Sequence, residues 1–490
     1  MQKGKEILIR IERVGFKGVG VGVLEKALNE ELLDDDIGKK VLVQNTLPGE
    51  LVLANVSRNK KNYIEARKVK TLEVSPLAVE PRCPHFEICG GCKWQNLPYD
   101  EQLKLKQEHV REALEHIGGF ENLEEVVRPI IGCSSPWNYR NKVELSFGWD
   151  ENMEQTFGFH SEGRRHDIFD ISECHLMSPR MFEIATSVKG FVEKNNLKPF
   201  KFRENAGLLR SLIIREGKNT GEVLVDLLCS GEDFPANLKE EFVEILKNLN
   251  VDSVYLTHIK TARGQRTQRE DILLHGKEKI EEKMTISRDE NDGAHNEQYT
   301  FEISPSSFFQ PNTLQAEILY KEAIENLKLE PDDTVLDLFC GTGTIGIILA
   351  KFASQVIGIE LNPDAVEDAK KNAELNNEGN IEFLVGDVGK VLEELENEGQ
   401  LDKLVGKKIV IDPPRSGLTP LMIEYILKLS PTTISYVSCN PSTQARDLKD
   451  LYENGYKITS VQPVDMFPHT YHIENVVGLS KSLGEESKAS

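Results

Sequence analysis

The stretch that most constrains the fold is VLDLFCGTGTIGIILAK, residues 335–351. An apolar strand runs here directly into a glycine-rich turn and then into an apolar helix. Gly341 and Gly343 allow the main chain to approach a ligand at the start of that helix. This arrangement is typical of the first βα unit of an open parallel sheet. From residue 331 onward we therefore expect an α/β domain with a doubly wound parallel sheet.

The rest of this region repeats the same alternation of strands and helices. The expected strands are TVLDLF (334–339), QVIGIE (355–360), IEFLVGD (381–387), KIVIDPP (408–414), ISYVSC (434–439) and ITSVQPVDMF (458–467). In such a sheet the carboxyl ends of the parallel strands form the edge at which ligands bind.

Acidic residues follow the first strands at that edge. Glu360 lies 19 residues after Gly341, close to the offset at which an acid binds ribose hydroxyls, and Asp387 ends the third strand. The glycines also fit the GxGxxG pattern of dinucleotide sites, and a glycine turn that serves only packing is a third reading. Together with Asp337 before the turn, the acids resemble S-adenosylmethionine (SAM) methyltransferases more closely than NAD enzymes.

The residues after the fourth and fifth strands bear on what is methylated. Enzymes that methylate exocyclic amines often have an aromatic residue after Asn- or Asp-Pro-Pro, whereas IDPPRSGL has Arg415 there, so amine methylation is the second choice. One strand later, Asn440-Pro441 ends the strand and leaves Cys439 at the same edge. A thiolate that adds to pyrimidine C6 makes C5 nucleophilic, and a base must then remove the C5 proton.

Glu474, in HTYHIENVVGL (469–479), is the candidate for that base. Each of these two residues also has a simpler reading. Cys439 could be a small packing residue, and Glu474 could form a surface ion pair with a neighbouring histidine.

Three cysteines stand close together near residue 90. Cys83, Cys89 and Cys92 have the spacing C-x5-C-x2-C, and Cys174 follows far downstream. Four thiolates suit either zinc or an iron–sulfur cluster, and the spacing alone leaves both open. We assign packing roles to Cys133 and Cys229.

Short apolar runs separated by glycines fill residues 4–75 and predict five strands in a small closed barrel of the OB type. The formal net charge of −21 argues against a polyanionic partner. The charge is uneven, however, because RNKKNYIEARKVK (58–70) has six basic residues and one acid. A local basic face of this kind can bind RNA.

Seven ordered stretches together resemble one enzyme family. They are CPHFEICGGCKWQ, YRNKVELSFG, SPSSFFQPN, DLFCGTGTIG, IDPPRSGL, YVSCNPSTQARDL and HIENVVGL. The chain resembles the RNA 5-methyluridine methyltransferases, in particular the bacterial 23S rRNA members with an N-terminal TRAM domain and an iron–sulfur cluster.

The resemblance implies specific roles for residues of this chain. Cys439 is the implied nucleophile and Glu474 the implied base, and a [4Fe–4S] cluster is favoured over zinc on Cys83, Cys89, Cys92 and Cys174. The residues that we expect to bind SAM are Gln310, Phe339, Gly341, Glu360, Asp387 and Asp412.

Three domains are expected: a TRAM barrel (1–75), a central α+β domain with the cluster (76–294) and the methyltransferase domain (295–490). The charged stretch 279–298 is expected to be a hairpin excursion without an assigned role. We expect a monomeric, cytoplasmic enzyme that acts on RNA and not on DNA or at a membrane, because the sequence has neither a membrane-length apolar run nor a secretory leader. Methylation of tRNA, and a SAM-binding RNA assembly factor without chemistry, remain as alternatives.

Overall fold

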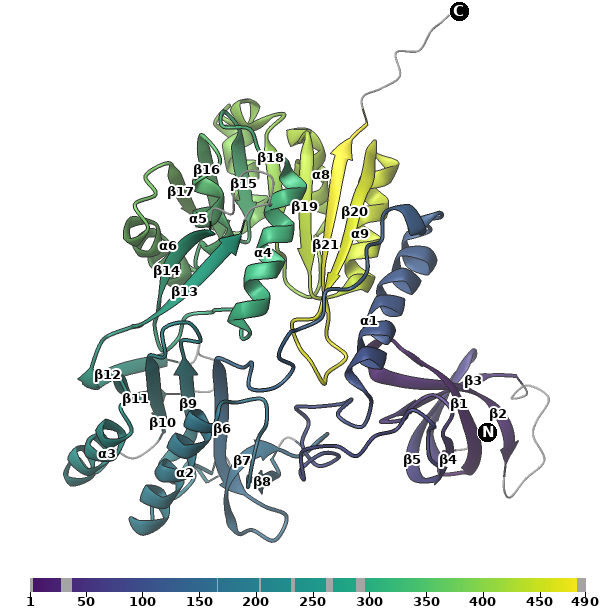
Figure 1. Ribbon diagram of the computed structural model, residues 1–490. Coiled ribbons are helices and arrows are strands. Elements are labelled where there is room, and N and C mark those ends of the chain that lie inside the picture. Colours follow the sequence, from purple (N-terminus) through teal and green to yellow (C-terminus); the bar gives the residue numbers. More distant parts are fainter. Residues whose placement is uncertain are drawn as a thin grey trace, which may run out of the picture. The chain divides into compact units, whose positions relative to one another are not determined.

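The structure is a computed structural model of the 490-residue chain (Figure 1). It describes residues 3–27, 38–164, 166–201, 204–230, 234–260, 268–287 and 296–482. The chain divides into two compact units. The first contains Met1–His109, Ser161–Gly163 and Phe467–His472, and the second contains the remaining residues.

The first unit is built on a closed five-stranded barrel with the order β1-β2-β3-β5-β4. Its interior is lined by alternate residues of each strand, such as Ile7, Ile9 and Ile11, which are buried. This alternation is the reason why short Val- and Ile-rich runs close into a barrel. The strands are β1 (Glu6–Gly15), β2 (Val19–Ala27), β3 (Lys40–Gln44), β4 (Leu51–Asn59) and β5 (Tyr63–Glu73).

One glycine of the barrel is required by close packing of the main chain. A Cβ atom at Gly22 would lie 2.2 Å from the carbonyl oxygen of Arg10 on the neighbouring strand. The closed strand order confirms the barrel that the sequence predicted. The first unit also contains the start of helix α1 (Tyr99–Ala113).

In the second unit, a seven-stranded sheet has the order β12-β11-β10-β9-β6-β7-β8. Helices α2 (Pro179–Lys194) and α3 (Ala236–Asn248) share a hydrophobic core with this sheet. Two of its strands have weak signals in the sequence. β8 has only three residues, and β12 is an edge strand that is mostly exposed, so neither has the apolar pattern of a buried strand. The strands are β6 (Lys142–Trp149), β7 (Gln155–His160), β8 (Ile168–Asp170), β9 (Leu209–Glu216), β10 (Val223–Cys229), β11 (Ser253–Lys260) and β12 (Gln268–Gly276).

The charged stretch 279–298 contributes to an antiparallel hairpin of β13 (Ile280–Ser287) and β14 (Asn296–Ile303). Residues 288–295, which connect the two strands, lie outside the described residues. The expected domain boundary at 294/295 falls between these two strands.

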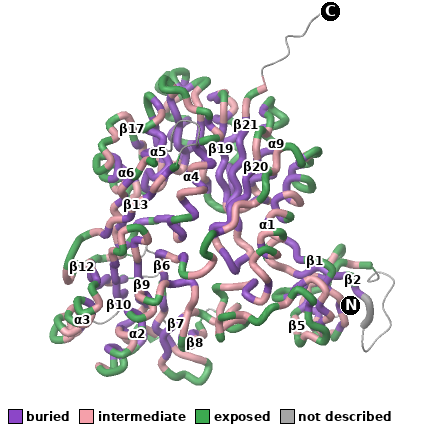
Figure 2. Tube along the Cα trace, in the orientation of Figure 1, coloured by how far each residue is buried: buried purple, intermediate pink, exposed green. Residues whose placement is uncertain are grey.

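A second seven-stranded sheet carries the candidate site and has the order β17-β16-β15-β18-β19-β21-β20. Helices α4, α5 and α6 pack on one of its faces, and α7, α8 and α9 form the layer on the other. Figure 2 shows that β19 and β21 are buried along most of their length. The strands are β15 (Thr334–Leu338), β16 (Gln355–Glu360), β17 (Ile381–Val385), β18 (Lys408–Ile411), β19 (Thr433–Ser438), β20 (Tyr456–Val464) and β21 (Glu474–Lys481). The helices are α4 (Thr313–Leu327), α5 (Thr344–Ala350), α6 (Pro363–Leu375), α7 (Val388–Asn397), α8 (Pro420–Leu429) and α9 (Pro441–Glu453).

The expectation of a wholly parallel sheet is wrong for its last strands. β15 to β19 are parallel, but β21 is antiparallel to both of its neighbours, β19 and β20. An antiparallel neighbour needs no crossover helix, so β20 and β21 can be joined by the short segment 465–473. As a consequence, the start of β21 lies at the same sheet edge as the end of β19.

Candidate active site

The glycine-rich turn follows β15 and has the conformation that its glycines permit. Phe339, Gly341 and Gly343 have positive φ angles of 67°, 55° and 78°. A Cβ at Gly343 would lie 2.9 Å from the ring of Phe383, whereas a Cβ at Gly341 would meet no described atom within 4 Å. Gly343 is therefore required by packing, and the main chain at Gly341 faces open space.

Glu360, at the end of β16, is held against this turn. One of its carboxylate oxygens accepts a hydrogen bond from the Gly341 N–H (3.1 Å), and the other accepts one from the Asn362 N–H (2.8 Å). The structure therefore brings the predicted Gly341 and Glu360 together. Asp387 lies at the start of α7, where its side chain accepts a hydrogen bond from the Lys390 N–H (3.2 Å) and caps the helix.

Two exposed apolar side chains occur at this edge and were not selected from the sequence. Leu361 follows Glu360 and is 65% exposed, and Val385 at the end of β17 is 50% exposed. Large apolar side chains that stay exposed beside polar groups often mark a binding surface. The signal available in the sequence was an apolar residue within two positions of each strand-ending acid.

Two carboxyl groups lie beneath the turn, of which that of Asp337 is buried and that of Asp412 is half-buried. Burial, together with the charge of Asp412, raises the pKa of Asp337 to about 7, although a backbone hydrogen bond from Gly346 acts in the opposite direction. Burial likewise raises the pKa of Asp412, at the end of β18, to about 7. Tyr320 of α4 is buried beside these groups, and its side chain hydrogen-bonds to Gln310. A cation placed here would be stabilised by both carboxylates.

Cys439 and Glu474 occupy adjoining positions on neighbouring strands. Ser438, the last residue of β19, pairs with Asn475 of β21, so the preceding Glu474 and the following Cys439 lie at the same place on the sheet edge. Cys439 is half-buried, and Glu474 is 4% exposed. The surface ion pair considered for Glu474 does not match this burial.

The charges of these residues affect one another. Burial raises the pKa of the Cys439 thiol to about 11, and the charge of Glu474 raises it as well. The charge of Arg415 and a hydrogen bond from its side chain lower the same pKa. Burial raises the pKa of Glu474 well above its usual value, and Arg415 again acts in the opposite direction. Arg415 is therefore part of the site, a role that the sequence did not reveal.

The loop that carries Arg415 (residues 412–418) is fastened to the start of α9. The main-chain oxygen of Arg415 accepts hydrogen bonds from the Asn440 side-chain amide (2.9 Å) and the Thr443 hydroxyl (3.2 Å). Asp447 accepts one from the Leu418 N–H (2.8 Å). The two sequence motifs IDPPRSGL and YVSCNPSTQARDL therefore form one hydrogen-bonded unit.

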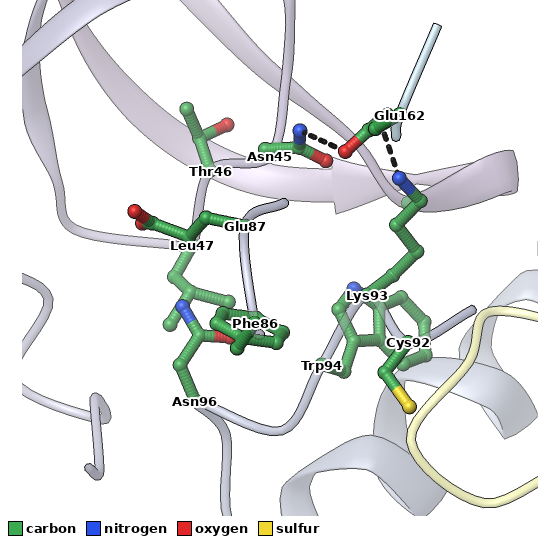
Figure 3. Close-up of a pocket in the computed structure, with 11 residues that line it drawn as sticks. Asn45, Thr46, Leu47, Phe86, Glu87, Cys92, Lys93, Trp94, Asn96 and Glu162 are labelled. Carbon is green, nitrogen blue, oxygen red and sulfur yellow. Dashed lines mark hydrogen bonds and ion pairs between the residues drawn. The ribbon is translucent and has the colours of Figure 1, made fainter. Parts of the chain in front are cut away.

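The cysteine segment, residues 81–98, belongs to the first unit. Cys83, Cys89 and Cys92 are half-buried there, and the Gly91 N–H donates a hydrogen bond to Cys89 Sγ (3.3 Å). Figure 3 shows a small pocket beside the segment, which is lined by Cys92 and in which Glu162 binds Asn45 (2.9 Å) and pairs with Lys93. Cys174 belongs to the second unit.

A metal site on these cysteines finds no support in the arrangement of the side chains. Throughout the part of the chain that the structure describes, no three His, Cys, Asp or Glu side chains are grouped so that they could hold a metal ion. No step of the chemistry below depends on a cluster.

Comparison with protein-family models gives a clear result. The model of the tRNA (uracil-5-)-methyltransferases matches residues 99–482, and the model of the TRAM domain matches residues 1–69. The chain belongs to the tRNA (uracil-5-)-methyltransferase family. This confirms an enzyme that methylates uracil C5 in RNA with SAM as the methyl donor, and it confirms the TRAM domain.

Relatives of this methyltransferase extend over the whole chain. A protein of Clostridium tetani named an uncharacterized RNA methyltransferase is 37% identical over 98% of this chain and 99% of its own length. One of Halalkalibacterium halodurans with the same description is 36% identical over 98% of both chains.

A solved structure supports the fold of the methyltransferase. The tRNA (uracil-54, C5)-methyltransferase of Pyrococcus abyssi, in complex with S-adenosyl-L-homocysteine, is 29% identical. It aligns with a TM-score of 0.69 over 98% of this chain and 100% of its own. Among the described residues of this methyltransferase, no helix has both the length and the apolar character needed to cross a membrane.

Proposed function

We propose that the methyltransferase modifies uridine at C5 through a covalent adduct with Cys439. The thiolate forms a bond to C6, and the electron pair of the C5–C6 double bond moves toward C5 and O4. C5 then takes the methyl group from the sulfonium of SAM, which leaves as S-adenosylhomocysteine. Glu474 removes the proton from C5, and the electrons of that bond restore the double bond and expel the thiolate.

The pairing of Ser438 with Asn475 is the observation that carries this proposal, because it places a thiol and a carboxyl group at adjoining positions of one sheet edge. A carboxylate in a desolvated site is a stronger base than one in water, which suits the removal of a proton from carbon. The thiol with a pKa of about 11 is mostly protonated at neutral pH, so Arg415, which lowers that pKa, promotes formation of the thiolate.

SAM would be held by Gln310, Phe339, Gly341, Glu360, Asp387 and Asp412. Support comes from the open space at Gly341, the hydrogen bond between Gly341 and Glu360, and the two carboxyl groups that favour a cation. Leu361 and Val385 add apolar surface suited to a planar adenine ring.

The target uridine must leave its base stack, because C6 is inaccessible within a helix. We propose 23S rRNA as the RNA, on the resemblance to its bacterial modifying enzymes. A tRNA is the second candidate, and the descriptions of the family model and of the Pyrococcus abyssi enzyme favour it. Mapping 5-methyluridine by mass spectrometry in rRNA and tRNA, from cells with and without the gene, decides between the two.

Three further parts of the sequence-based interpretation remain in the proposal. A [4Fe–4S] cluster on Cys83, Cys89, Cys92 and Cys174 rests on the cysteine spacing and on the Gly91 N–H that faces Cys89 Sγ. Protein purified without air should then be brown and contain iron, whereas colourless, active protein free of iron would remove the cluster from the proposal. The second part is the division of the chain into domains at residues 75 and 294. The third is that the protein is a monomer located in the cytoplasm.

Replacement of Cys439 tests the mechanism. Cys439→Ala should abolish methylation and the covalent RNA adduct but leave SAM affinity unchanged. The control, Cys229→Ala in the core of the central sheet, should keep both methylation and adduct formation. Turnover by Cys439→Ala would refute the adduct mechanism.

A further inference from the structure

Strand β13 of the hairpin carries a carboxyl group that is completely buried. Glu282 has no exposed surface, and four hydrogen-bond donors surround its side chain. They are the N–H groups of Lys218 (2.7 Å), Asn219 (2.9 Å) and Lys283 (3.0 Å) and the hydroxyl of Thr313 (2.7 Å). Burial raises the pKa of Glu282, and these hydrogen bonds lower it. Because each of these four groups is a donor, the environment fits an ionised carboxylate.

From Glu282 a chain of hydrogen bonds leads to the main chain of Gln310. The Thr313 hydroxyl donates to Glu282 and accepts from the side-chain amide of Asn141 (2.9 Å). The same amide of Asn141 donates to the main-chain oxygen of Gln310 (2.7 Å), and the Asn141 N–H donates to the oxygen of Pro311 (2.9 Å). Thr313 is fully buried and Asn141 almost so.

The carboxylate sets the direction in which the Thr313 hydroxyl donates. A threonine hydroxyl has one hydrogen, and an ionised Glu282 can only accept, so that hydrogen is used on Glu282. The hydroxyl oxygen of Thr313 is then left to accept from Asn141, whose second amide hydrogen is directed at Gln310. Without the negative charge, the hydroxyl could rotate and donate to Asn141, and the amide could turn away from Gln310.

Gln310 lies at the candidate active site, since the main-chain oxygen of Phe308, two residues before it, accepts a hydrogen bond of 3.5 Å from the Thr342 hydroxyl of the glycine turn. The Gln310 side chain also lowers the pKa of Tyr320. The phenol of Tyr320 is close enough to Asp412, Glu474 and Asp337 for their charges to raise its pKa. A shift of the main chain at Gln310 would therefore move a group that faces the reacting centre.

We propose that Glu282 is a positioning residue for methyl transfer, which acts through Thr313 and Asn141 on Gln310. This inference rests on the proposed function, because it takes Gln310 to bind SAM. It also gives the charged hairpin a role: the hairpin supplies the fixed charge that orders the Gln310 segment, although it is remote in sequence from the glycine turn.

The test compares variants by SAM affinity, measured by titration calorimetry, by kcat and KM for SAM, and by melting temperature. Glu282→Gln and Thr313→Val should each raise the dissociation constant for SAM about tenfold, the factor expected for the loss of a hydrogen bond to a charged group. Thr313→Ser keeps the hydroxyl and should restore wild-type affinity. Glu281→Gln is the matched control, since alternation along β13 directs this neighbour to the other face.

A double-mutant cycle separates positioning from general stability. If Glu282 acts through Gln310, then Glu282→Gln should weaken SAM binding in the wild-type background but have no further effect in a Gln310→Ala background. Additive effects of the two substitutions would overturn the inference about Glu282 but not the proposed function. The same holds if Glu282→Gln binds SAM with wild-type affinity while Gln310→Ala binds it weakly. Unchanged affinity in Gln310→Ala would overturn the assignment of Gln310 as a SAM ligand, and the inference with it.

Discussion

The side-chain amide of Asn440 donates a hydrogen bond of 2.9 Å to the main-chain oxygen of Arg415, across 25 residues of sequence. Asn440 directly follows the candidate nucleophile, and Arg415 belongs to the loop after β18. The hydrogen bond therefore anchors the main chain of Arg415, whose side-chain cation lowers the pKa of the neighbouring thiol.

Removal of the Arg415 cation should make the thiol less acidic. In Arg415→Gln, the pKa of Cys439 should rise above its value of about 11, because both the charge and the hydrogen bond that lower it are lost. The rate of alkylation of Cys439 by iodoacetamide at pH 8 should fall about tenfold for each unit by which the pKa rises, and methylation should slow with it. Lys449→Gln, on the exposed side of α9, should leave both rates unchanged.

Removal of the Glu474 charge should have the opposite effect on the thiol. Glu474→Gln loses a negative charge that raises the pKa of Cys439, so alkylation at pH 8 should become faster than in the wild type. Methylation should nevertheless be lost, and methylated RNA should remain attached to Cys439, because no base takes the C5 proton. Slower alkylation in this variant would contradict the electrostatic link between the two residues.

The buried carboxyl group of Asp337 should make the stability of the unliganded protein depend on pH. Its pKa rises from 3.8 in the unfolded chain to about 7 in the fold, so the folded state binds the proton more tightly. Its stabilising contribution is complete below about pH 4 and is lost as the pH rises through 7.

Asp337→Asn should therefore melt at a higher temperature than the wild type at pH 8.5, by about 2–4 °C for each kcal/mol recovered, and at a similar temperature at pH 4.5. Melting curves recorded at both pH values, with the exposed Asp332→Asn as control, measure this effect. A wild-type protein that becomes more stable relative to Asp337→Asn between pH 5 and 8 would show the opposite linkage.

The hydrogen bonds between α9 and the loop that carries Arg415 should depend on Asp447. Its carboxylate accepts hydrogen bonds from the Leu418 N–H and the Tyr436 hydroxyl (2.7 Å), both buried. Asp447→Asn should lower the free energy of unfolding by about 1–3 kcal/mol, the usual cost of a buried polar group left without its partner. Chemical denaturation measures the loss, and Asp450→Asn, exposed on the same helix, is the control.

The basic segment of the barrel, residues 58–70, should contribute to RNA binding. Lys60, Lys61 and Arg67 are exposed, and Lys68 is half-buried. Reversal of these four charges should weaken RNA binding and reduce the slope of log K against log[salt] by about 0.7–0.9 for each RNA phosphate that the protein no longer neutralises. Fluorescence anisotropy at several salt concentrations gives the slope. An unchanged slope would place the RNA footprint elsewhere, and Lys40→Glu, outside the segment, is the comparison.

The sequence predicted the parts of the fold that strong local patterns encode. The structure confirms the glycine turn and the strands beside it. They could be predicted because a buried strand is a continuous apolar run and a turn with positive φ favours glycine. Strand β21 was not among the expected strands, and its antiparallel direction was therefore missed. The run ENVVGLSK is apolar whichever way the strand is oriented, so only the length of the connection could have revealed its direction.

Interactions between residues far apart in the sequence could not be predicted in the same way. Arg415 and Asp447 act through hydrogen bonds to main-chain groups and through charge, and neither property produces a periodic pattern. Glu282 was read as one acid among many in a charged stretch, because only the fold shows that it is buried.

Strand β21 is the last of the described strands in chain order, yet it pairs on both sides with strands that precede it, β19 and β20. During synthesis the sheet therefore has a gap in its interior until residues 474–481 have left the ribosome. Until then the glycine turn has been synthesised, but the sheet is incomplete and Glu474 is not yet paired next to Cys439. The order of translation therefore brings Glu474 next to Cys439 only after the other described strands of this sheet have been synthesised.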